Sequence, residues 1–353
     1  MSELKSTQLF NPDADTSLEN RMLIGGETTH MMILSDNKYP WSNKLYQTMM
    51  GNFWIPERVT MTVDKQQYVL LSQEEQEAYD KIISFLIFLD SLQTKNLPNI
   101  NDVVTLPEIG LLLTIQQYQE ALHSQSYGYI LESVADAKKK ASIYKIATSD
   151  KFLRTRNQYI VDHYQEFINN QSERGFVKVM MANYLLEGIY FYAGFTFFYN
   201  LARNDKMTGT AQQIKYINRD ELTHLALFQG MFRELRKERP ELFTADLEAE
   251  LSEMMKQAVE HEIAWGAYAI GDRIQGLSVE SITQYIKYLS NYRMKRIGLT
   301  PLYPEVTEDP FPWVERFTDF NGAKTDFFEE EVINYSKSTK LNLGGLKGKF
   351  GKK

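Results

Sequence analysis

The sequence predicts an all-α protein whose long helices pack together as a bundle. Apolar residues recur at helical spacing along most of the chain, for example at Ile82, Phe85, Leu86 and Leu89. The alternating apolar and polar residues and the tight hairpin turns of a β-sheet are missing from the sequence. With 353 residues, the chain is long enough to bury the large core that a helical bundle needs.

Composition narrows the class of protein. Hydrophobic residues make up 43% of the chain and charged residues 24%, which is ordinary for a soluble globular protein. The formal net charge of −7 argues against a nucleic-acid partner, because phosphate backbones attract basic surfaces. The chain has no cysteine, which excludes disulfides, thiolate metal ligands and cysteine nucleophiles.

We expect no segment of the sequence to target or cross a membrane. Residues 1–20 are polar and lack the apolar run of a secretory signal. The most apolar segment, residues 180–202, contains Asn183 and Glu187, and a carboxylate at the centre of a bilayer costs on the order of 3 kcal/mol. We therefore interpret this segment as a buried bundle helix and expect a cytoplasmic protein without membrane contact.

The sequence pattern divides the chain into three parts. Residues 1–40 show no sustained period and are predicted to form an irregular N-terminal arm. The helical domain is expected to cover residues 41–298. Residues 299–353 are first proline-rich, then acidic, and then rich in Gly and Lys from Lys337 onward. This composition predicts a C-terminal extension that ends in a flexible tail.

Several helix boundaries can be predicted within the helical domain. Ser72 and Glu75 have the spacing of a capping box and mark the start of one helix. This helix is expected to end near Leu97, because Pro98 follows and proline interrupts a helix. Pro107 is expected to open the next helix, since proline is well tolerated in a first turn. Further helices are predicted at about residues 140–148, 151–169, 175–202, 209–236, 245–270 and 279–296.

A short motif, Glu-x-x-His, occurs on two of the predicted helices. It pairs Glu120 with His123 and Glu221 with His224. Residues three apart lie on one face of a helix, so each pair can direct a carboxylate and an imidazole at the same point. The alternative is a pair of salt bridges on helix surfaces. A third match, at residues 27–30, falls in the irregular arm and is interpreted as coincidence.

Two further carboxylates stand in apolar helical segments. Asp90 lies in the helix before the first motif, and Glu187 lies in the helix before the second. A buried carboxylate is costly unless it is paired or binds a metal, and a single buried Glu more often meets an Arg or Lys. Four helices that carry Asp, Glu-x-x-His, Glu and Glu-x-x-His have the ligand set of a di-iron or di-manganese bundle site. Carboxylates with imidazoles suit iron and manganese.

These residues together resemble the small, radical-generating subunit of class I ribonucleotide reductase, within the ferritin-like superfamily. The stretch from His123 to Tyr127 is similar to the family segment in which a tyrosine follows the first histidine by four residues. Residues 219–224 resemble the second ligand stretch, and residues 52–56 resemble the segment that places a tryptophan near the metals. The resemblance runs from about Trp41 to Tyr292 and implies a ferritin-like bundle with additional helices.

The resemblance implies a role for each matching residue. One metal ion would be held by Asp90, Glu120 and His123, and the other by Glu187, Glu221 and His224, with some carboxylates bridging. Tyr127 would become a stable neutral radical after the reduced metals react with dioxygen, inside an apolar pocket of Phe191, Phe195 and Ile217. The ions would be two irons, two manganese ions or one of each. The metal pair itself could store the oxidising equivalent instead of Tyr127.

The resemblance also implies a partner. Trp54 and Asp220 match a relay that runs from His123 toward the surface, and Tyr335 matches an interfacial tyrosine near the C-terminus. In this family the thiols that reduce the ribonucleotide belong to the large subunit, which fits a chain without cysteine. We therefore expect a homodimer whose C-terminal tail docks on a large subunit. Residues 341–353 contain several Lys and Gly where many family tails are more acidic, so the details of docking stay open.

Two other functions share part of this pattern. A stand-alone dimetal oxidase acting on an organic substrate would have the same six ligands, but it would need a substrate tunnel rather than a surface relay. A metal store would need neither Tyr127 nor Trp54. The ligand order together with Tyr127, Trp54 and Asp220 favours the radical-generating subunit.

Overall fold

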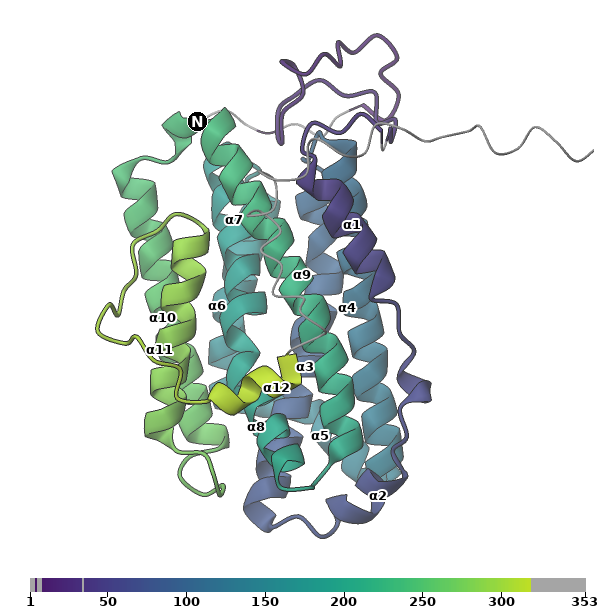
Figure 1. Cartoon of the computed structure of the whole chain (residues 1–353), viewed down its shortest axis with the longest axis vertical. Coiled ribbons are helices and arrows are strands. Elements are labelled where there is room, and N and C mark those ends of the chain that lie inside the picture. The colour runs from purple at the N-terminus through teal and green to yellow at the C-terminus, as the bar shows by residue number, and fades with distance from the viewer. Residues whose placement is uncertain (1–3, 5–7, 34, 319–353) are drawn as a thin grey trace, which may run out of the picture.

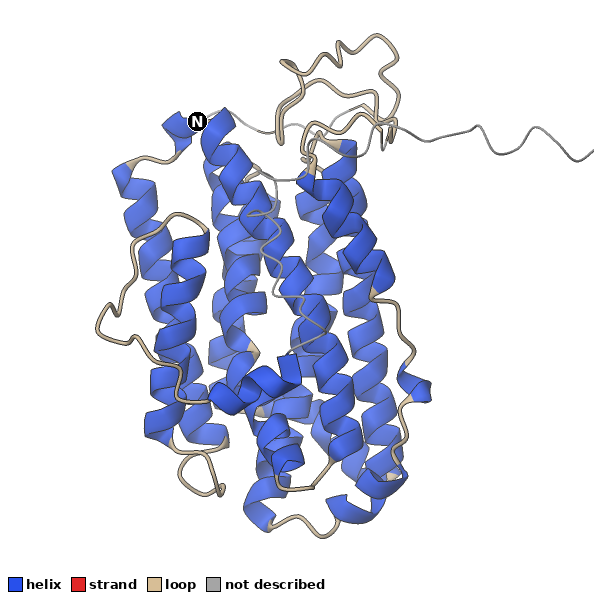
Figure 2. Cartoon of the chain, in the orientation of Figure 1, coloured by secondary structure: helices blue, strands red, loops and turns tan. Residues whose placement is uncertain are grey.

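The computed structural model describes residue 4, residues 8–33 and residues 35–318 of the chain. Over these ranges the protein is built from helices and loops without a β-strand, and an isolated antiparallel bridge joins Ile24 to Val104 (Figure 2). The predicted all-α class is therefore confirmed. Tyr335, which the resemblance matches to an interfacial tyrosine, and the tail from Lys337 onward lie outside the described residues.

The described residues before Trp41 contain no helix, and the helical bundle follows. Two helices that the sequence pattern did not reveal, α1 and α2, precede the predicted ones. The α-helices are α1 (Trp41–Gly51), α2 (Thr62–Tyr68), α3 (Gln73–Asn101), α4 (Pro107–Val134), α5 (Ala137–Ser149), α6 (Lys151–Asn169), α7 (Glu173–Leu185), α8 (Tyr192–Arg203), α9 (Thr208–Glu238), α10 (Ala245–Ala269), α11 (Val279–Arg296) and α12 (Glu315–Thr318). A π-helical segment, η2 (Leu186–Tyr190), joins α7 to α8.

The long helices run along the long axis of the molecule, and α10 and α11 lie at one side of the bundle (Figure 1). Helix α3 packs against α4 and α7, and α9 packs against α4, α7 and η2. The side chains between them form one continuous apolar core. Helices α3 and α4 therefore share a common interior with η2 and α9, which come much later in the chain.

Side-chain caps fix where many helices begin. Ser72 and Glu75 form the predicted capping box, with the Glu75 N–H donating to the Ser72 hydroxyl over 3.2 Å and the Ser72 N–H donating to Glu75 over 3.0 Å. Helix α4 opens with Pro107, as predicted. Side-chain oxygens cap five of the other predicted helices, at Asp136, Asp150, Ser172, Thr244 and Ser278.

The prediction that Pro98 ends the third helix is wrong, because α3 continues through Pro98 to Asn101. Proline has no N–H, so the carbonyl of Thr94 loses its usual partner one turn later. That carbonyl instead accepts a hydrogen bond from the Gln117 side chain of α4 over 3.2 Å. The replacement bond comes from a neighbouring helix, which a local reading of the sequence does not reveal.

The single long helix predicted over residues 175–202 is also wrong in one respect. The helical path is continuous in direction, but the five residues Leu186–Tyr190 adopt π-helical geometry between α7 and α8. All five residues are buried, and Glu187 is one of them. A π-helical turn inserts one extra residue and often marks a functional site.

The start of α9 is capped by a residue from another helix. Met207, just before α9, has a left-handed backbone (φ 52°) and provides no side-chain cap. The buried carboxylate of Asp64, on α2, accepts hydrogen bonds from the N–H groups of Gly209 (2.9 Å) and Thr210 (2.6 Å) and from the Thr210 hydroxyl (2.7 Å). Asp64 thereby satisfies donors that the first turn of a helix leaves unpaired.

No helix in the described part of the chain combines the length and the apolar character that crossing a lipid bilayer would require.

We predict that Asp64→Asn lowers the free energy of unfolding of the metal-free protein by about 1–3 kcal/mol, because a charged acceptor of three buried donors is lost. Urea denaturation followed by circular dichroism measures this change. The same substitution at the exposed Asp13 serves as the control and should leave stability unchanged. Equal stability of the two variants would show that Asp64 does not cap α9.

Candidate metal centre

Four carboxylates and two imidazoles converge in the core between α3, α4, η2 and α9. All six side chains are 0% exposed. The sequence pattern explains their direction, because each Glu-x-x-His pair lies on the inner face of its helix. The six residues are Asp90 on α3, Glu120 and His123 on α4, Glu187 on η2, and Glu221 and His224 on α9.

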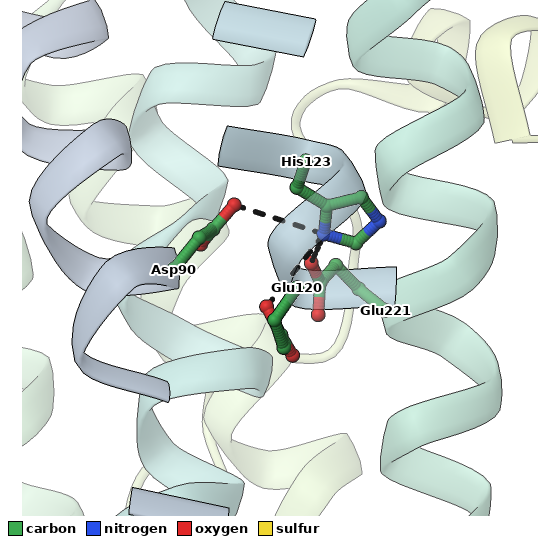
Figure 3. Close-up of side chains that lie close together, drawn as sticks. All are labelled: Asp90, Glu120, His123 and Glu221. Carbon is green, nitrogen blue, oxygen red and sulfur yellow. Dashed lines mark ion pairs between the residues drawn. The ribbon is translucent and has the colours of Figure 1, made fainter. Parts of the chain in front are cut away.

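The first group surrounds the Nδ1 atom of His123 (Figure 3). This atom lies 3.1 Å from Glu221 Oε1, 3.6 Å from Glu120 Oε2 and 3.7 Å from Asp90 Oδ2. The four ligand atoms of this group all lie within 4.8 Å of one another. Side chains from three helices therefore point at one small volume.

The second group surrounds the Nδ1 atom of His224. This atom lies 3.0 Å from Glu221 Oε2, 3.2 Å from Glu120 Oε1 and 3.3 Å from Glu187 Oε2. Glu120 and Glu221 belong to both groups, and each directs one oxygen to each histidine. They occupy the positions that carboxylates bridging two ions would take.

The hydrogen bonds of the oxygen and nitrogen atoms in the two groups show whether these residues suit metal ions. Apart from the ion pairs within the cluster, both oxygens of Asp90, both oxygens of Glu120, Oε1 of Glu221 and Nδ1 of His123 have no hydrogen-bond partner within the described residues. Leaving buried polar atoms unsatisfied is costly, and for charged groups the cost is larger. Oxygen and imidazole ligands at this spacing suit divalent iron or manganese. The residues present therefore fit a pair of such ions.

Burial and mutual charge shift the pKa values of the cluster apart. Burial, with the neighbouring carboxylates, raises the pKa of Asp90 and of Glu221 well above the ordinary range. Burial also acts to raise the pKa of Glu120, but the nearby imidazoles outweigh it and lower that pKa to about 2. Burial lowers the pKa of His224, but Glu120 and Glu187 outweigh it and raise that pKa to about 10. Without metal, the cluster therefore holds protons that a bound cation would displace.

Asp220, next to the ligand Glu221, links the first group to Trp54. The indole N–H of Trp54 donates to Asp220 Oδ2 over 2.8 Å, and the same oxygen lies 3.4 Å from Nε2 of His123. The structure thus brings Trp54, Asp220 and His123 together in the order that the sequence predicts. A carboxylate on the outer nitrogen of a metal-binding histidine is a usual arrangement, since it fixes the tautomer and the ring orientation.

Tyr127 is fully buried on α4, about two turns after Glu120. Its hydroxyl makes no hydrogen bond of ordinary geometry within the described residues, but it interacts with the carboxyl group of Asp90. Burial and then the charge of Asp90 raise the pKa of the Tyr127 hydroxyl well above its ordinary range, so the phenol stays protonated. The predicted pocket residues Phe191, Phe195 and Ile217 are buried in the same apolar core.

Comparison with known proteins identifies the family. The sequence model of the family described as "Ribonucleotide reductase, small chain" matches residues 32–310. The chain belongs to this family. It is 47% identical to "Ribonucleoside-diphosphate reductase subunit beta" of Treponema pallidum (strain Nichols), over 96% of this chain and 97% of the relative. It is 35% identical to the protein of the same name from Halalkalibacterium halodurans, with the same coverage of both chains.

A solved structure gives the same result for the fold. The chain is similar to "Ribonucleotide reductase R2 subunit from Clostridium botulinum", with a TM-score of 0.88 and 45% sequence identity. The similarity covers 90% of this chain and all of that one. The expected ferritin-like bundle of a ribonucleotide reductase small chain is therefore confirmed.

The small chain also contains a cluster of amide side chains that the sequence reasoning missed. Gln116 donates to Oε1 of Glu187 over 2.9 Å, and Gln93 and Asn183 donate to the same oxygen. The hydroxyl of Tyr164 donates to Gln93 over 2.5 Å. These contacts hold one oxygen of Glu187 and leave Oε2 directed at His224. The signal was present in the sequence, because each amide lies one helical turn from a ligand residue on its own helix.

Gln119 also lies one helical turn from a ligand residue, His123, and the sequence analysis missed it as well. This residue connects the candidate metal centre to a surface cavity. Its side-chain oxygen lies 3.0 Å from Nε2 of His224, as Asp220 lies beside His123. Gln119, Asp220 and Trp54 line a cavity of about 340 Å³, together with largely apolar side chains that include the exposed Phe53 and Tyr118. The outer neighbours of both histidines thus border one opening on the surface.

We predict that Asp90→Asn stabilises the metal-free protein by about 1–3 kcal/mol, because burial and the charges of Glu120 and Glu187 disfavour a carboxyl group at this position. Asp64→Asn is the matched comparison, since Asp64 is equally buried but satisfied, and it should change stability in the opposite direction. Thermal denaturation of the metal-free variants measures both. A loss of stability in Asp90→Asn would show that the position is optimised for the fold and not for a ligand.

Proposed function

We propose that this chain is the radical-generating small subunit of a class I ribonucleoside-diphosphate reductase, and that it stores an oxidising equivalent on Tyr127 for use by a large subunit. The observation that supports this most strongly is the convergence of six buried ligand residues, two of them shared, beside a buried tyrosine and a hydrogen-bonded tryptophan. Membership of the small-chain family supports the same assignment.

The residues assigned to the two ions follow from the two groups around the histidines. Asp90, Glu120 and His123 would hold one ion, and Glu187, Glu221 and His224 the other, with Glu120 and Glu221 bridging. With dioxygen as the oxidant, a bound pair of iron or manganese ions would supply the oxidising power needed to remove one electron from a phenol. The donor set accepts two irons, two manganese ions or one of each, since both metals prefer these ligands.

The chain itself protects the oxidised residue. Oxidation of Tyr127 removes one electron and the hydroxyl proton, which leaves a neutral radical. The surroundings of Tyr127 are apolar and exclude water, with Phe191, Phe195 and Ile217 assigned as its pocket. A fully buried phenol is shielded from reductants in solution.

Trp54 and Asp220 provide a route from the centre to the surface. Trp54 donates its indole N–H to Asp220, which contacts His123, and Trp54 also lines the surface cavity. Asp220 is therefore placed to hold the indole proton while an electron moves through Trp54. Tyr335 is assigned as the next step, in the tail beyond the described residues.

A large subunit is the partner that this chemistry requires. The chain has no cysteine, so the thiols that reduce a ribonucleotide must come from another polypeptide. The relatives carry the name "subunit beta", which supports an assembly with a second kind of subunit. We propose that the small chain acts as a homodimer, that residues 41–298 form the helical domain, and that the C-terminal tail docks on the large subunit.

The geometry favours this function over a stand-alone oxidase. An oxidase would need its substrate cavity to reach the metal ligands. The cavity of about 340 Å³ is lined by Trp54, Asp220 and Gln119, and none of the six ligand residues contributes to it. It therefore opens onto the relay rather than onto the metals.

We predict that Tyr127→Phe abolishes the tyrosyl signal in the electron paramagnetic resonance spectrum of the metal-loaded, oxygen-treated protein. Metal content should stay at two ions per chain, because Tyr127 is not a ligand. The control is Tyr79→Phe, which removes another buried tyrosine whose hydroxyl bonds to Thr210 over 2.9 Å. A radical of unchanged line shape in Tyr127→Phe would contradict the assignment.

A further inference from the structure

The π-helical segment η2 sets the position of Glu187. In an α-helix each residue turns the chain by about 100°, so one inserted residue rotates everything after it relative to what comes before. If η2 relaxed to regular α-helix, Glu187 and the following Phe191 would change their angular relation to the core. Something must hold this irregular segment in place, because a π-helical turn is rarely stable by itself.

Two buried side chains from neighbouring helices bind the backbone where η2 passes into α8. Arg156, on α6, donates from Nη2 to the carbonyl oxygen of Tyr190 over 3.2 Å. Glu262, on α10, accepts a hydrogen bond from the N–H of Ala193 over 3.0 Å. Arg156 and Glu262 also form an ion pair with each other. The pair therefore satisfies one acceptor and one donor of the irregular backbone and ties both to the surrounding helices.

The deep burial of the Arg156–Glu262 ion pair is not explained by stability alone. Arg156 is 3% exposed and Glu262 is 0% exposed. The guanidinium lies over the rings of Phe85 (4.0 Å) and Tyr190 (4.2 Å), while its Nε and Nη1 atoms have no hydrogen-bond partner within the described residues. Apolar residues of similar volume are often as stabilising as a buried ion pair. The Arg156–Glu262 pair is therefore better explained by the backbone geometry that its hydrogen bonds specify.

We propose that Arg156 and Glu262 are positioning residues that hold η2 in its π-helical register and thereby keep Glu187 directed at the metal centre. This inference rests on the proposed function of Glu187 as a ligand. The pair acts on the backbone after Glu187, whereas Gln93, Gln116 and Asn183 act on its side-chain oxygen. The backbone contacts of the Arg156–Glu262 pair and the side-chain contacts to Glu187 are therefore independent of each other. The pair also sets the directions in which Phe191 and Phe195 project from the helix, in the pocket assigned to Tyr127.

Hydrogen exchange on the metal-free protein tests the proposal directly. Arg156→Met/Glu262→Met removes both charges together, which avoids leaving one buried charge unpaired. We expect the amides of residues 186–193 to exchange at least about tenfold faster than in the wild type, since local opening is governed by local contacts. In the metal-loaded protein, we expect the content to fall from two ions per chain toward one, because only the Glu187 group is displaced.

A second variant separates the hydrogen bond from packing. Arg156→Met/Glu262→Gln has no buried charge but keeps a side-chain oxygen that can accept from the Ala193 N–H. We expect exchange between that of the wild type and that of the double-Met variant. Equal exchange in the two variants would overturn the proposal, because it would show that the bond to Ala193 does not hold the segment.

The matched control is Arg239→Met/Glu173→Met. It removes an ion pair that binds the first turn of α7, on the same helical path but far from η2. Wild-type exchange over residues 186–193 is expected in this control. If the double-Met variant at Arg156 and Glu262 behaves like the control, the proposal is wrong. The metal content of the wild type tests the proposed function separately, because the exchange experiment uses no metal.

Discussion

The burial of four carboxylates close together in the core is the constraint on which the rest of this structure depends. Asp90, Glu120, Glu187 and Glu221 can carry four negative charges, and His123 and His224 can supply at most two positive ones. Without metal, the cluster approaches neutrality only by keeping protons. Burial and the neighbouring carboxylates raise the pKa values of Asp90 and Glu221. Burial lowers the pKa values of both imidazoles, but the surrounding carboxylates outweigh it and raise them. Two divalent ions would balance the four carboxylates with both histidines neutral, which is the form in which imidazole binds a metal.

The surroundings of the cluster repeat one device of helical geometry. A residue that lies one turn from a ligand residue, or next to it, contacts a ligand residue that in most cases belongs to another helix. Gln116 and Asn183 hold Oε1 of Glu187 in this way, and Gln119 meets the outer nitrogen of His224. Asp220 meets the outer nitrogen of His123 and also binds Trp54. The same contacts that orient the ligands therefore build the route from the centre to the surface cavity.

The closeness of the six side chains was easier to predict from the sequence than the helix boundaries, for physical reasons. The Glu-x-x-His pairs were recognisable because their geometry is local, and Asp90 because it stands out in an apolar helix. Pro98 was misjudged because the carbonyl that it leaves free is satisfied by Gln117 of another helix. The π-helical turn left no local signal either, since its backbone partners, Arg156 and Glu262, are distant in sequence. Both errors come from tertiary contacts that override local propensity.

The position of the metal ions is the most direct test of this account. Crystals of the protein loaded with iron or manganese should be measured at the absorption edge of the metal, so that anomalous scattering locates each ion. The account predicts two peaks per chain, one among Asp90, Glu120 and His123 and the other among Glu187, Glu221 and His224. A single peak, or peaks away from the two histidines, would contradict it.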